Sequence, residues 1–284
     1  MIAILMSTYN GEKYIQEQIE SLLQQTVTDW QLFVRDDGSK DQTVNIIGEY
    51  VRKYPQKIFL STDAKGNLGA GSSFMYLLEN VSADYYMFCD QDDVWLPQKI
   101  SQTLVKLKEL ERNYGSNTGI GVFSDLTVVD AELNVLEPSL WKADNRHPEY
   151  TKSFYKQWTN RHATYGCTQM INEAAKQIVL PYKQFEGVMG AHDNWIEYIL
   201  IKKGIYDYIE ESTILYRQHG ANVIGGNFGY NYRTEAKSMV KKPYELFQKL
   251  KKDYKRSKQM PFYVSFTVIL IYRLYQTIFS IFKN

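Results

Sequence analysis

The sequence predicts an α/β protein whose central sheet is mostly parallel and doubly wound. In residues 1–110, short apolar runs of strand length alternate with segments whose apolar residues recur at helical spacing. This alternation at short spacing is typical of βα units and a parallel sheet. Polar or acidic residues follow three of the apolar runs, where each strand should end. Because right-handed crossovers bring these ends to one edge of the sheet, we expect the three loops to face one crevice.

Four strands are predicted in the first half, and each leads towards a helix. The strands lie at residues 2–6, 31–35, 58–60 and 85–89. The helices lie at residues 14–23, from residues 40–43 onward, through residues 74–78, and after Pro97, which suits a first helical turn. The glycine-rich stretch at residues 66–71 lies in the wrong place for a dinucleotide fingerprint and is interpreted as a turn.

The second half is predicted to add three strands and one helix. The strands lie at residues 120–129, 165–170 and 214–219, and the helix begins at residues 190–195 and continues through Leu200. Residues 134–150 are polar and aromatic with two prolines, so we expect an exposed insertion there. The last strand leads into a glycine-containing loop at residues 220–230.

Length and composition are those of a globular protein. A chain of 284 residues with 44% hydrophobic residues can bury a sizeable core, as one large domain or one domain with an appendage. Cys89 and Cys167 lie in apolar segments, so we expect two buried thiols and a reducing compartment. The first residues lack the basic region of a signal peptide.

The C-terminal stretch, residues 234–284, differs from the rest. From Lys237 onward there are 11 Lys or Arg and 2 acidic residues, whereas the preceding residues hold 22 basic and 30 acidic ones. This asymmetry predicts that a basic helical tail meets an anionic surface. Residues 262–282 are largely apolar but contain Arg273, which favours a helix in the membrane plane over a spanning one. The alternative is a helix packed on the body or on a second subunit.

Three carboxylates, Asp90, Asp92 and Asp93, follow the strand predicted at residues 85–89. Closely spaced carboxylates repel one another unless a cation lies between them, and Mg²⁺ is usually held by one or two carboxylates plus substrate phosphates. The spacing therefore favours a divalent cation that carries a phosphorylated ligand. The alternative is a solvated acidic turn in which Asp93 caps the next helix.

Further carboxylates lie at the ends of other predicted elements. Asp36 and Asp37 end a strand, where each could accept hydrogen bonds from a nucleobase or ribose, or cap the following helix. Asp193 begins a predicted helix, whose N-terminus stabilises the anion. It is a candidate general base if it faces a cleft, and otherwise a helix cap.

Two basic side chains lie near the end of the last predicted strand. His219 could ligate a metal or meet a phosphate, although a lone loop histidine is more often structural. Arg217 points the same way along the strand and could meet a diphosphate. The four histidines show no zinc-type spacing, and the sequence contains no G-x-S-x-G elbow, no P-loop and no nucleic-acid motif.

Taken together, three segments resemble the signatures of family 2 glycosyltransferases with the GT-A fold. They are Ile4-Leu5-Met6-Ser7-Thr8-Tyr9-Asn10-Gly11, Val34-Arg35-Asp36-Asp37-Gly38-Ser39 and Phe88-Cys89-Asp90-Gln91-Asp92-Asp93. In this order and spacing the motifs are specific, and the resemblance covers residues 1–225. The segments at residues 90–95 and 216–219 look most like bacterial rhamnosyltransferases that use dTDP-rhamnose.

The resemblance implies a role for each matched residue. The donor nucleotide would be held by Ser7, Thr8, Tyr9, Asn10, Asp36, Asp37, Asp90, Gln91 and Arg217. Mn²⁺ or Mg²⁺ at the diphosphate would be bound by Asp92, Asp90 and His219. Asp193 would be the catalytic base, and the acceptor side would be lined by Gly166, Cys167, Thr168 and His192.

The implied fold is a Rossmann-like, mostly parallel sheet flanked by helices, with a C-terminal helical extension. Its domain would span residues 1–233, with a nucleotide-binding half (1–110) and an acceptor half (111–233), followed by the tail at 234–284. The implied activity is inverting, metal-dependent transfer of a sugar, L-rhamnose in the narrower match, to a lipid-linked saccharide in cell-surface polysaccharide synthesis. The expected place is the inner face of the cell membrane, with a homodimer left open and no nucleic-acid partner.

Three alternatives stay open at this point. A UDP-hexose-dependent glycosyltransferase would use the same carboxylates. A nucleotidyltransferase would need a basic phosphate-binding loop after the first strand, which residues 7–12 do not supply. A non-catalytic nucleotide-sugar-binding scaffold at the membrane would bind the donor without turnover.

Overall fold

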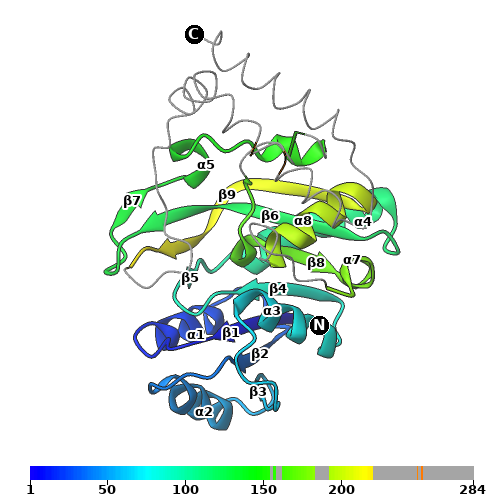
Figure 1. Ribbon diagram of the computed structural model, residues 1–284. Coiled ribbons are helices and arrows are strands. Elements are labelled where there is room, and N and C mark those ends of the chain that lie inside the picture. The colour runs from blue at the N-terminus through cyan, green and yellow to red at the C-terminus, as the bar shows by residue number, and fades with distance from the viewer. Residues whose placement is uncertain (154–155, 158–161, 183–191, 220–247, 249–250, 252–284) are drawn as a thin grey trace. The chain divides into compact units, whose positions relative to one another are not determined.

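The described strands form one mixed sheet, shown in Figure 1. The structure is a computed structural model of the chain and describes residues 1–153, 156–157, 162–182, 192–219, 248 and 251. The strand order is β3-β2-β1-β4-β8-β6-β9-β5, and β7 pairs with β6 outside this path. The α/β class predicted from the sequence is confirmed.

The first four strands run parallel to one another. β1 (Ile2–Thr8) lies between β2 (Trp30–Asp36) and β4 (Tyr85–Cys89), and β2 pairs in turn with β3 (Ile58–Ser61). Residues 2–6 are all buried, as expected for a central parallel strand covered on both faces. All four strands predicted in the first half are therefore confirmed.

Helices connect these strands. α1 (Ile15–Leu23) and α2 (Thr43–Lys53) contact each other, whereas α3 (Ala70–Asn80) contacts β1, β2 and the later helix α8 (His192–Lys203). The strand order reverses between β1 and β4. Open α/β sheets bind ligands at such a switch point, outside the carboxyl ends of the strands. β1 includes Ser7 and Thr8, which were predicted to lie in the turn, so the loops that leave the sheet at this place follow Thr8 and Cys89.

The second half extends the sheet with strands of both directions. α4 (Lys99–Tyr114) leads into β6 (Ile120–Val129), which runs parallel to the long β9 (Ile205–Arg217). β8 (Met170–Asn172) lies antiparallel to both β4 and β6 and so joins the two halves. The short β5 (Val94–Trp95) pairs with β9, which brings the chain after Asp93 beside the residues before Arg217. The other described elements are β7 (Val135–Glu137), α5 (Leu140–Ala143), α7 (Glu173–Val179) and the 3₁₀ turns Pro148–Lys152 and Gly166–Thr168.

Three predictions for the second half are wrong. The strand predicted at residues 165–170 is a 3₁₀ turn, and strand pairing starts only at Met170, because the backbone of Gly166 packs against the His192 ring. The last strand begins at Ile205 rather than at residue 214. Residues 134–150 are not wholly an exposed insertion, because Trp141 is buried against Phe123.

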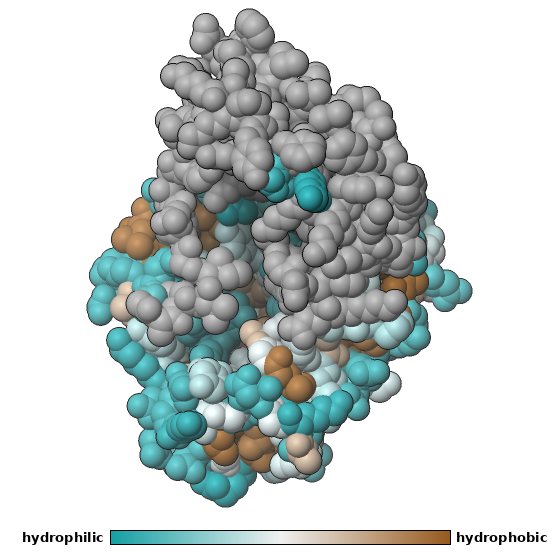
Figure 2. Space-filling model, in the orientation of Figure 1, coloured by the Kyte–Doolittle hydropathy of each residue, from teal (hydrophilic) through white to brown (hydrophobic). Residues whose placement is uncertain are grey.

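Few large hydrophobic side chains are exposed among the described residues. On the face shown in Figure 2, hydrophobic atoms form small groups within a mainly hydrophilic surface. Val135 and Leu136 on β7 are about half-exposed. The other exposed large hydrophobic residues are Tyr9 in the loop after β1, Val44 on α2, and Val105 and Tyr114 on α4.

Packing contacts divide the chain into two units. The first comprises residues 1–148 and 162–226 and holds the whole sheet, and the second comprises residues 149–161 and 227–284. The domain boundary predicted at residue 233 stays a prediction. The predicted loop at residues 220–230 and nearly all of the predicted tail lie outside the described residues. Where the structure describes the chain, no helix is long and apolar enough to cross a membrane.

Candidate active site

The loops that follow β1 and β2 are tied together by hydrogen bonds. Thr8 Oγ1 donates to Asp36 Oδ1 (2.9 Å), and the backbone N–H of Asn10 donates to Ser39 Oγ (2.8 Å). Asp36 Oδ2 also accepts from the backbone N–H groups of Gly38 (3.0 Å) and Ser39 (2.8 Å). Asp36 therefore organises its own turn and binds that turn to β1.

Gln91 joins the loop after β4 to the loop after β1. Its side chain accepts from the N–H of Tyr9 (2.9 Å) and donates to the carbonyl of Tyr9 (3.0 Å). Gly11 permits this pairing, because a Cβ there would lie 2.3 Å from Gln91 Oε1. Ser7 is partly buried, and the Tyr9 side chain is half-exposed. The clustering of three loops predicted from the crossovers is therefore present.

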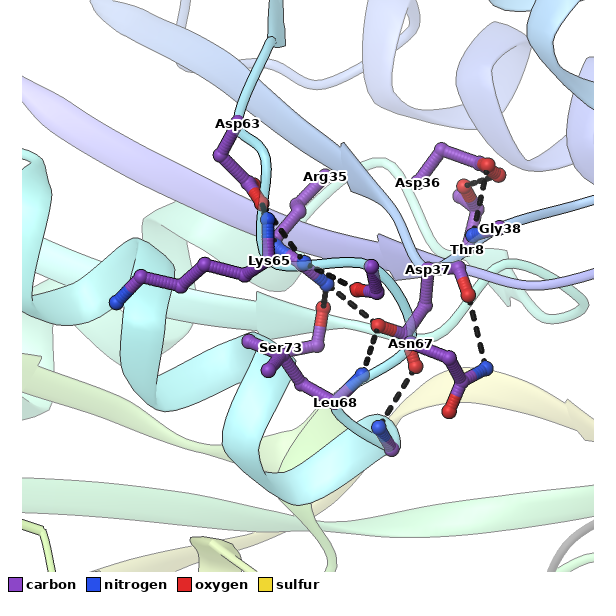
Figure 3. Close-up of polar contacts among 12 residues, drawn as sticks. Thr8, Arg35, Asp36, Asp37, Gly38, Asp63, Lys65, Asn67, Leu68 and Ser73 are labelled. Atoms are coloured by element: carbon purple, nitrogen blue, oxygen red, sulfur yellow. Dashed lines mark hydrogen bonds and ion pairs between the residues drawn. The ribbon is translucent and has the colours of Figure 1, made fainter.

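Asp37 is held by donors from the loop before α3 (Figure 3). It is buried, and its carboxylate accepts from the backbone N–H groups of Leu68 (2.7 Å) and Gly69 (2.8 Å). The Asn67 side chain donates to the Asp37 carbonyl (2.8 Å). Residues 66–69 of the glycine-rich stretch form the loop before α3, which Asp37 fixes beside β2, whereas Ala70 and Gly71, predicted to belong to the turn, already lie in α3.

Arg35 neutralises Asp37 within the same network (Figure 3). Its guanidinium donates to Asp37 Oδ1 (2.5 Å), to Asp63 Oδ2 (2.8 Å) and to the Gly66 carbonyl (2.8 Å), and its side chain is 1% exposed. The Asp37 carboxylate is therefore committed to internal contacts. Its predicted contact with a nucleobase or ribose stays a prediction.

A second group of carboxylates follows β4, and these repel one another. Asp90, Asp93 and Cys167 each offer a potential ligand atom, and the three atoms lie within 4.8 Å of one another. Burial, with the charges of Asp92 and Asp193, raises the pKa of Asp90 to about 7. Burial and the neighbouring carboxylates also hold the pKa of Asp93 well above its usual value. These shifts mark a place where negative charge is not fully compensated.

Cys89 and Cys167 are buried free thiols, as predicted. Burial raises the pKa of both groups, and in Cys167 the charges of Asp93 and Asp90 add to the effect. Both side chains therefore remain thiols at neutral pH. Cys167 lies against the carboxylates after β4, and its predicted place on the acceptor side stays a prediction.

Lys99 is a buried cation that the sequence analysis missed. It lies at the start of α4 with no exposed surface, and its Nζ donates to Thr213 Oγ1 (3.2 Å). Burial lowers its pKa to about 8, although the nearby groups, Asp93 among them, oppose the shift. The charge of Lys99 acts on Asp93, whereas Asp92 and Asp193 add negative charge around Asp90, so the site still favours a further positive charge. Because lysine is rarely buried, the burial of Lys99 could have been predicted only from its position on the apolar face of its helix.

Asp92 and His219, both predicted metal ligands, are brought together. His219 Nε2 lies 2.8 Å from Asp92 Oδ2, and the His219 and Asp92 side chains are 12% and 17% exposed. The His219 ring also packs on the Tyr14 ring, with centroids 4.7 Å apart. Carboxylate oxygens and one imidazole are a donor set that fits Mn²⁺ or Mg²⁺ beside substrate phosphates.

Arg217 is enclosed by the protein. Its side chain is 2% exposed, and its guanidinium donates to the carbonyls of Asp92 (2.8 Å) and Ala131 (2.5 Å) and to the carboxylate of Glu17. Its backbone N–H donates to Asp93 Oδ1 (3.0 Å). Asp93 is not the helix cap considered from the sequence, because α4 begins at Lys99 and Gln98 holds the cap position. These contacts hold the loop after β4, and the predicted contact of Arg217 with a diphosphate stays a prediction.

Asp193 lies in the first turn of helix α8, near the carboxylates that follow β4. Asp193 is 8% exposed, and its Oδ1 accepts from the N–H of Asn194 (2.7 Å) in the first turn, where the helix dipole stabilises an anion. Its charge helps to raise the pKa of Asp90, so the two carboxylates lie near each other. Gly166 packs on the start of α8, because a Cβ there would lie 2.5 Å from His192 Nε2 and 3.7 Å from Asp193 Cβ.

His192 supports the start of α8 from inside the protein. Its ring centroid lies 4.3 Å from that of Phe74 and 5.0 Å from that of Phe88. Burial lowers the pKa of His192, so the imidazole is neutral, and its Nε2 has no hydrogen-bond partner among the described residues. Thr168 is also buried and donates to the Tyr165 carbonyl (2.7 Å) within the 3₁₀ turn. Their predicted contact with an acceptor stays a prediction.

A family model supplies the identification. The model of glycosyl transferase family 2 matches residues 3–179, which is more than half of the chain and includes all three loops. The chain belongs to glycosyltransferase family 2. The resemblance drawn from the three sequence motifs is confirmed.

Curated relatives agree with this family. The chain is 28% identical over 247 residues to dTDP-rhamnosyl transferase RfbG of Shigella flexneri, which covers 83% of this chain and 79% of RfbG. It is 29% identical over 224 residues to the uncharacterized glycosyltransferase MJ1057 of Methanocaldococcus jannaschii, covering 76% and 70% of the two chains. The protein is therefore a glycosyltransferase that uses a nucleotide sugar.

Solved structures show the same fold. S. aureus TarS 1-349 in complex with UDP-GlcNAc matches with a TM-score of 0.55 at 17% identity, covering 78% of this chain and 59% of TarS 1-349. The mannosyltransferase PcManGT from Pyrobaculum calidifontis, in complex with GDP-Man and Mn²⁺, matches with a TM-score of 0.58 at 12% identity, covering 96% and 69%. This glycosyltransferase has the GT-A fold expected from its sequence, and it spans less than two thirds of the TarS chain.

Proposed function

We propose that this glycosyltransferase is inverting and metal-dependent, and that it moves L-rhamnose from dTDP-rhamnose to a hydroxyl of a lipid-linked saccharide in cell-surface polysaccharide synthesis. The observation that carries the proposal is the pair of Asp92 and His219 at the carboxyl end of β4, beside Asp90, whose pKa is raised by burial and by the charges of Asp92 and Asp193. The relative RfbG supports the rhamnosyl donor.

Asp92 and His219, with Asp90 beside them, are the proposed holders of Mn²⁺ or Mg²⁺. When bound, the ion supplies positive charge for the leaving nucleoside diphosphate. The loop after β1 and the paired Gln91 position the nucleotide at the switch point of the sheet. PcManGT, a structural neighbour, was solved in complex with GDP-Man and Mn²⁺, which supports a metal-dependent reaction.

Asp193 is the proposed general base. Its carboxylate lies in the first turn of α8, where it can take the proton of an acceptor hydroxyl. The acceptor oxygen bonds to the anomeric carbon as the bond from that carbon to the diphosphate breaks, and the acceptor proton passes to the Asp193 carboxylate. Attack from the face opposite the leaving group inverts the configuration at that carbon.

We further propose that residues 234–284 hold the enzyme peripherally at the inner face of the cell membrane. The support is the sequence, which places 11 Lys or Arg and an apolar stretch in this segment. Flotation of the full chain with vesicles of anionic lipid, compared with vesicles of zwitterionic lipid, tests this. Binding to neither kind would favour packing of the tail on the body or in a homodimer.

The experiment that tests the donor is a thermal-shift and turnover screen of dTDP-rhamnose against UDP-sugars, with and without Mn²⁺. We expect metal-dependent stabilisation and slow hydrolysis with dTDP-rhamnose alone. A response to a UDP-sugar would support the glycosyltransferase activity but refute dTDP-rhamnose as the donor. A UDP-sugar is the second candidate donor, because TarS was solved in complex with UDP-GlcNAc. Binding without turnover of any donor would favour the non-catalytic scaffold.

A further inference from the structure

The first turn of α1 contacts the end of β9, although the two segments are far apart in the sequence. Glu17 in this turn forms an ion pair with Arg217, the last residue of β9. The guanidinium of Arg217 also lies 4.7 Å from the centre of the Tyr14 ring, at the residue before α1 begins. We name Tyr14, Glu17 and Arg217 the α1–β9 brace.

The brace also holds the loop that carries Asp92. Arg217 donates from Nε to the Asp92 carbonyl (2.8 Å) and from its backbone N–H to Asp93 Oδ1 (3.0 Å). Two successive residues of the loop are therefore fixed by one arginine. The Arg217 side chain is 2% exposed, so the guanidinium acts from inside the protein.

The other arm of the brace reaches His219. The Tyr14 ring lies 4.7 Å from the His219 ring, centroid to centroid, at an interplanar angle of 32°. The same Tyr14 ring thus lies against both Arg217 and His219. Because His219 Nε2 lies 2.8 Å from Asp92 Oδ2, the brace supports both members of the candidate ligand pair.

We propose that Tyr14, Glu17 and Arg217 are positioning residues that set Asp92 and His219 at the geometry for binding the divalent cation with the donor diphosphate. The proposal rests on the proposed function, in which Asp92 and His219 hold the ion. Residues that orient metal ligands from outside typically change metal affinity 10–100-fold when replaced. The brace acts through its contacts with Asp92 and His219.

The test measures Mn²⁺ binding directly, by the loss of the electron paramagnetic resonance signal of free Mn²⁺ on titration into the full chain with dTDP present. Glu17→Gln removes the charge that faces Arg217 while keeping the side-chain shape, and the Glu17 side chain is 49% exposed, so the fold tolerates it. We expect its dissociation constant for Mn²⁺ to rise about tenfold. The matched control is Glu20→Gln on the same helix, whose carboxylate accepts hydrogen bonds from Gln16 (3.0 Å) and Tyr50 (2.8 Å), and we expect it to bind Mn²⁺ like the wild type.

A second pair of variants tests the other arm. Tyr14→Phe keeps the ring against His219 and is expected to bind Mn²⁺ like the wild type. Tyr14→Leu removes the ring and is expected to weaken Mn²⁺ binding about tenfold. Unfolding temperatures measured without metal separate loss of the brace from loss of the fold. If Tyr14→Leu unfolds at a much lower temperature than the wild type, the Glu17→Gln result alone decides the proposal.

The outcomes separate this proposal from the proposed function. If the wild type binds Mn²⁺ in the presence of dTDP, and both Glu17→Gln and Tyr14→Leu bind it equally well, the positioning role of the brace is refuted. The proposed metal site is then still supported. If Glu20→Gln weakens binding as much as Glu17→Gln, the effect is not specific to the brace and the proposal is also overturned. If the wild type binds no Mn²⁺ in the presence of dTDP, both proposals fail.

Discussion

The aspartates that end β2 and those that follow β4 hold similar positions in the sheet, but their surroundings are opposite. The Asp37 carboxylate accepts two backbone N–H bonds and is paired with the buried Arg35. Asp90 and Asp93 instead crowd against further carboxylates, and burial with like charge raises the pKa of each. The negative charge of Asp37 is balanced within the protein, whereas the charges of Asp90 and Asp93 are not.

The difference separates scaffold from site. A carboxylate with a full set of internal donors gains little from a ligand, because its charge is already stabilised. Carboxylates that repel one another, and whose pKa is raised, are where an external cation lowers the free energy most. The same residue type at two strand ends can therefore serve the fold at one and bind a ligand at the other.

The largest expected effect comes from Asp193→Asn. We expect this change to lower kcat about 10²- to 10⁴-fold, because the acceptor proton loses its base, while binding of dTDP-rhamnose with Mn²⁺ stays unchanged. Turnover assays and calorimetry on the same preparation measure the two quantities. Loss of donor binding in this variant would show that Asp193 is not the base.

The next effect tests the scaffold side. Asp37→Ala leaves Arg35 buried without one of its partners, and we expect the free energy of unfolding to fall by about 3–5 kcal/mol in urea titrations. The control is Asp29→Ala, whose side chain is 80% exposed, and it should change stability by less than about 1 kcal/mol. A stable Asp37→Ala protein that has lost only donor binding would reverse the assignment of Asp37 to the scaffold.

Asp92→Asn tests the site side. We expect the affinity for dTDP-rhamnose in the presence of Mn²⁺ to fall roughly 100-fold, because the carboxylate that faces His219 is gone, whereas the affinity without metal should not change. Calorimetric titrations with and without EDTA give both values. Full activity of Asp92→Asn would refute its metal role.

The smallest effect concerns pH and the metal-free protein. The pKa of Asp90 is raised on folding, so the folded state holds this proton more tightly than the unfolded state. The contribution of Asp90 to the free energy of unfolding is therefore highest at low pH and falls as pH rises towards 7, by about 2 kcal/mol between pH 5 and pH 7. Denaturant titrations should show that the free energy of unfolding falls less in Asp90→Asn than in the wild type. An equal fall would show that another group is responsible for the pH dependence.

The first half of the fold was predictable because its physics is local. Central parallel strands read as continuous apolar runs, and residues 2–6 show this pattern and are all buried. The shared edge of the three loops followed from crossover handedness. The role of Gly11 was not predictable, because it depends on the close packing of the Gln91 side chain, which comes from a distant part of the sequence.

The second half was less predictable because distant contacts decide it. The apolar stretch at residues 165–170 looks like a strand, but the close packing of Gly166 on His192 makes a 3₁₀ turn there. The start of β9 was missed because Glu210 and Glu211 interrupt its apolar pattern. The ion pair of Arg217 with Glu17 joins segments that no local pattern relates.

The most direct test of the central claim is the affinity for dTDP-rhamnose, measured by calorimetry with and without Mn²⁺ at pH 6 and pH 8. If the carboxylates after β4 bind the donor through a cation, binding requires Mn²⁺ and tightens about tenfold from pH 6 to pH 8, because Asp90, with a pKa of about 7, must lose its proton. Donor binding that is independent of both metal and pH would contradict the account.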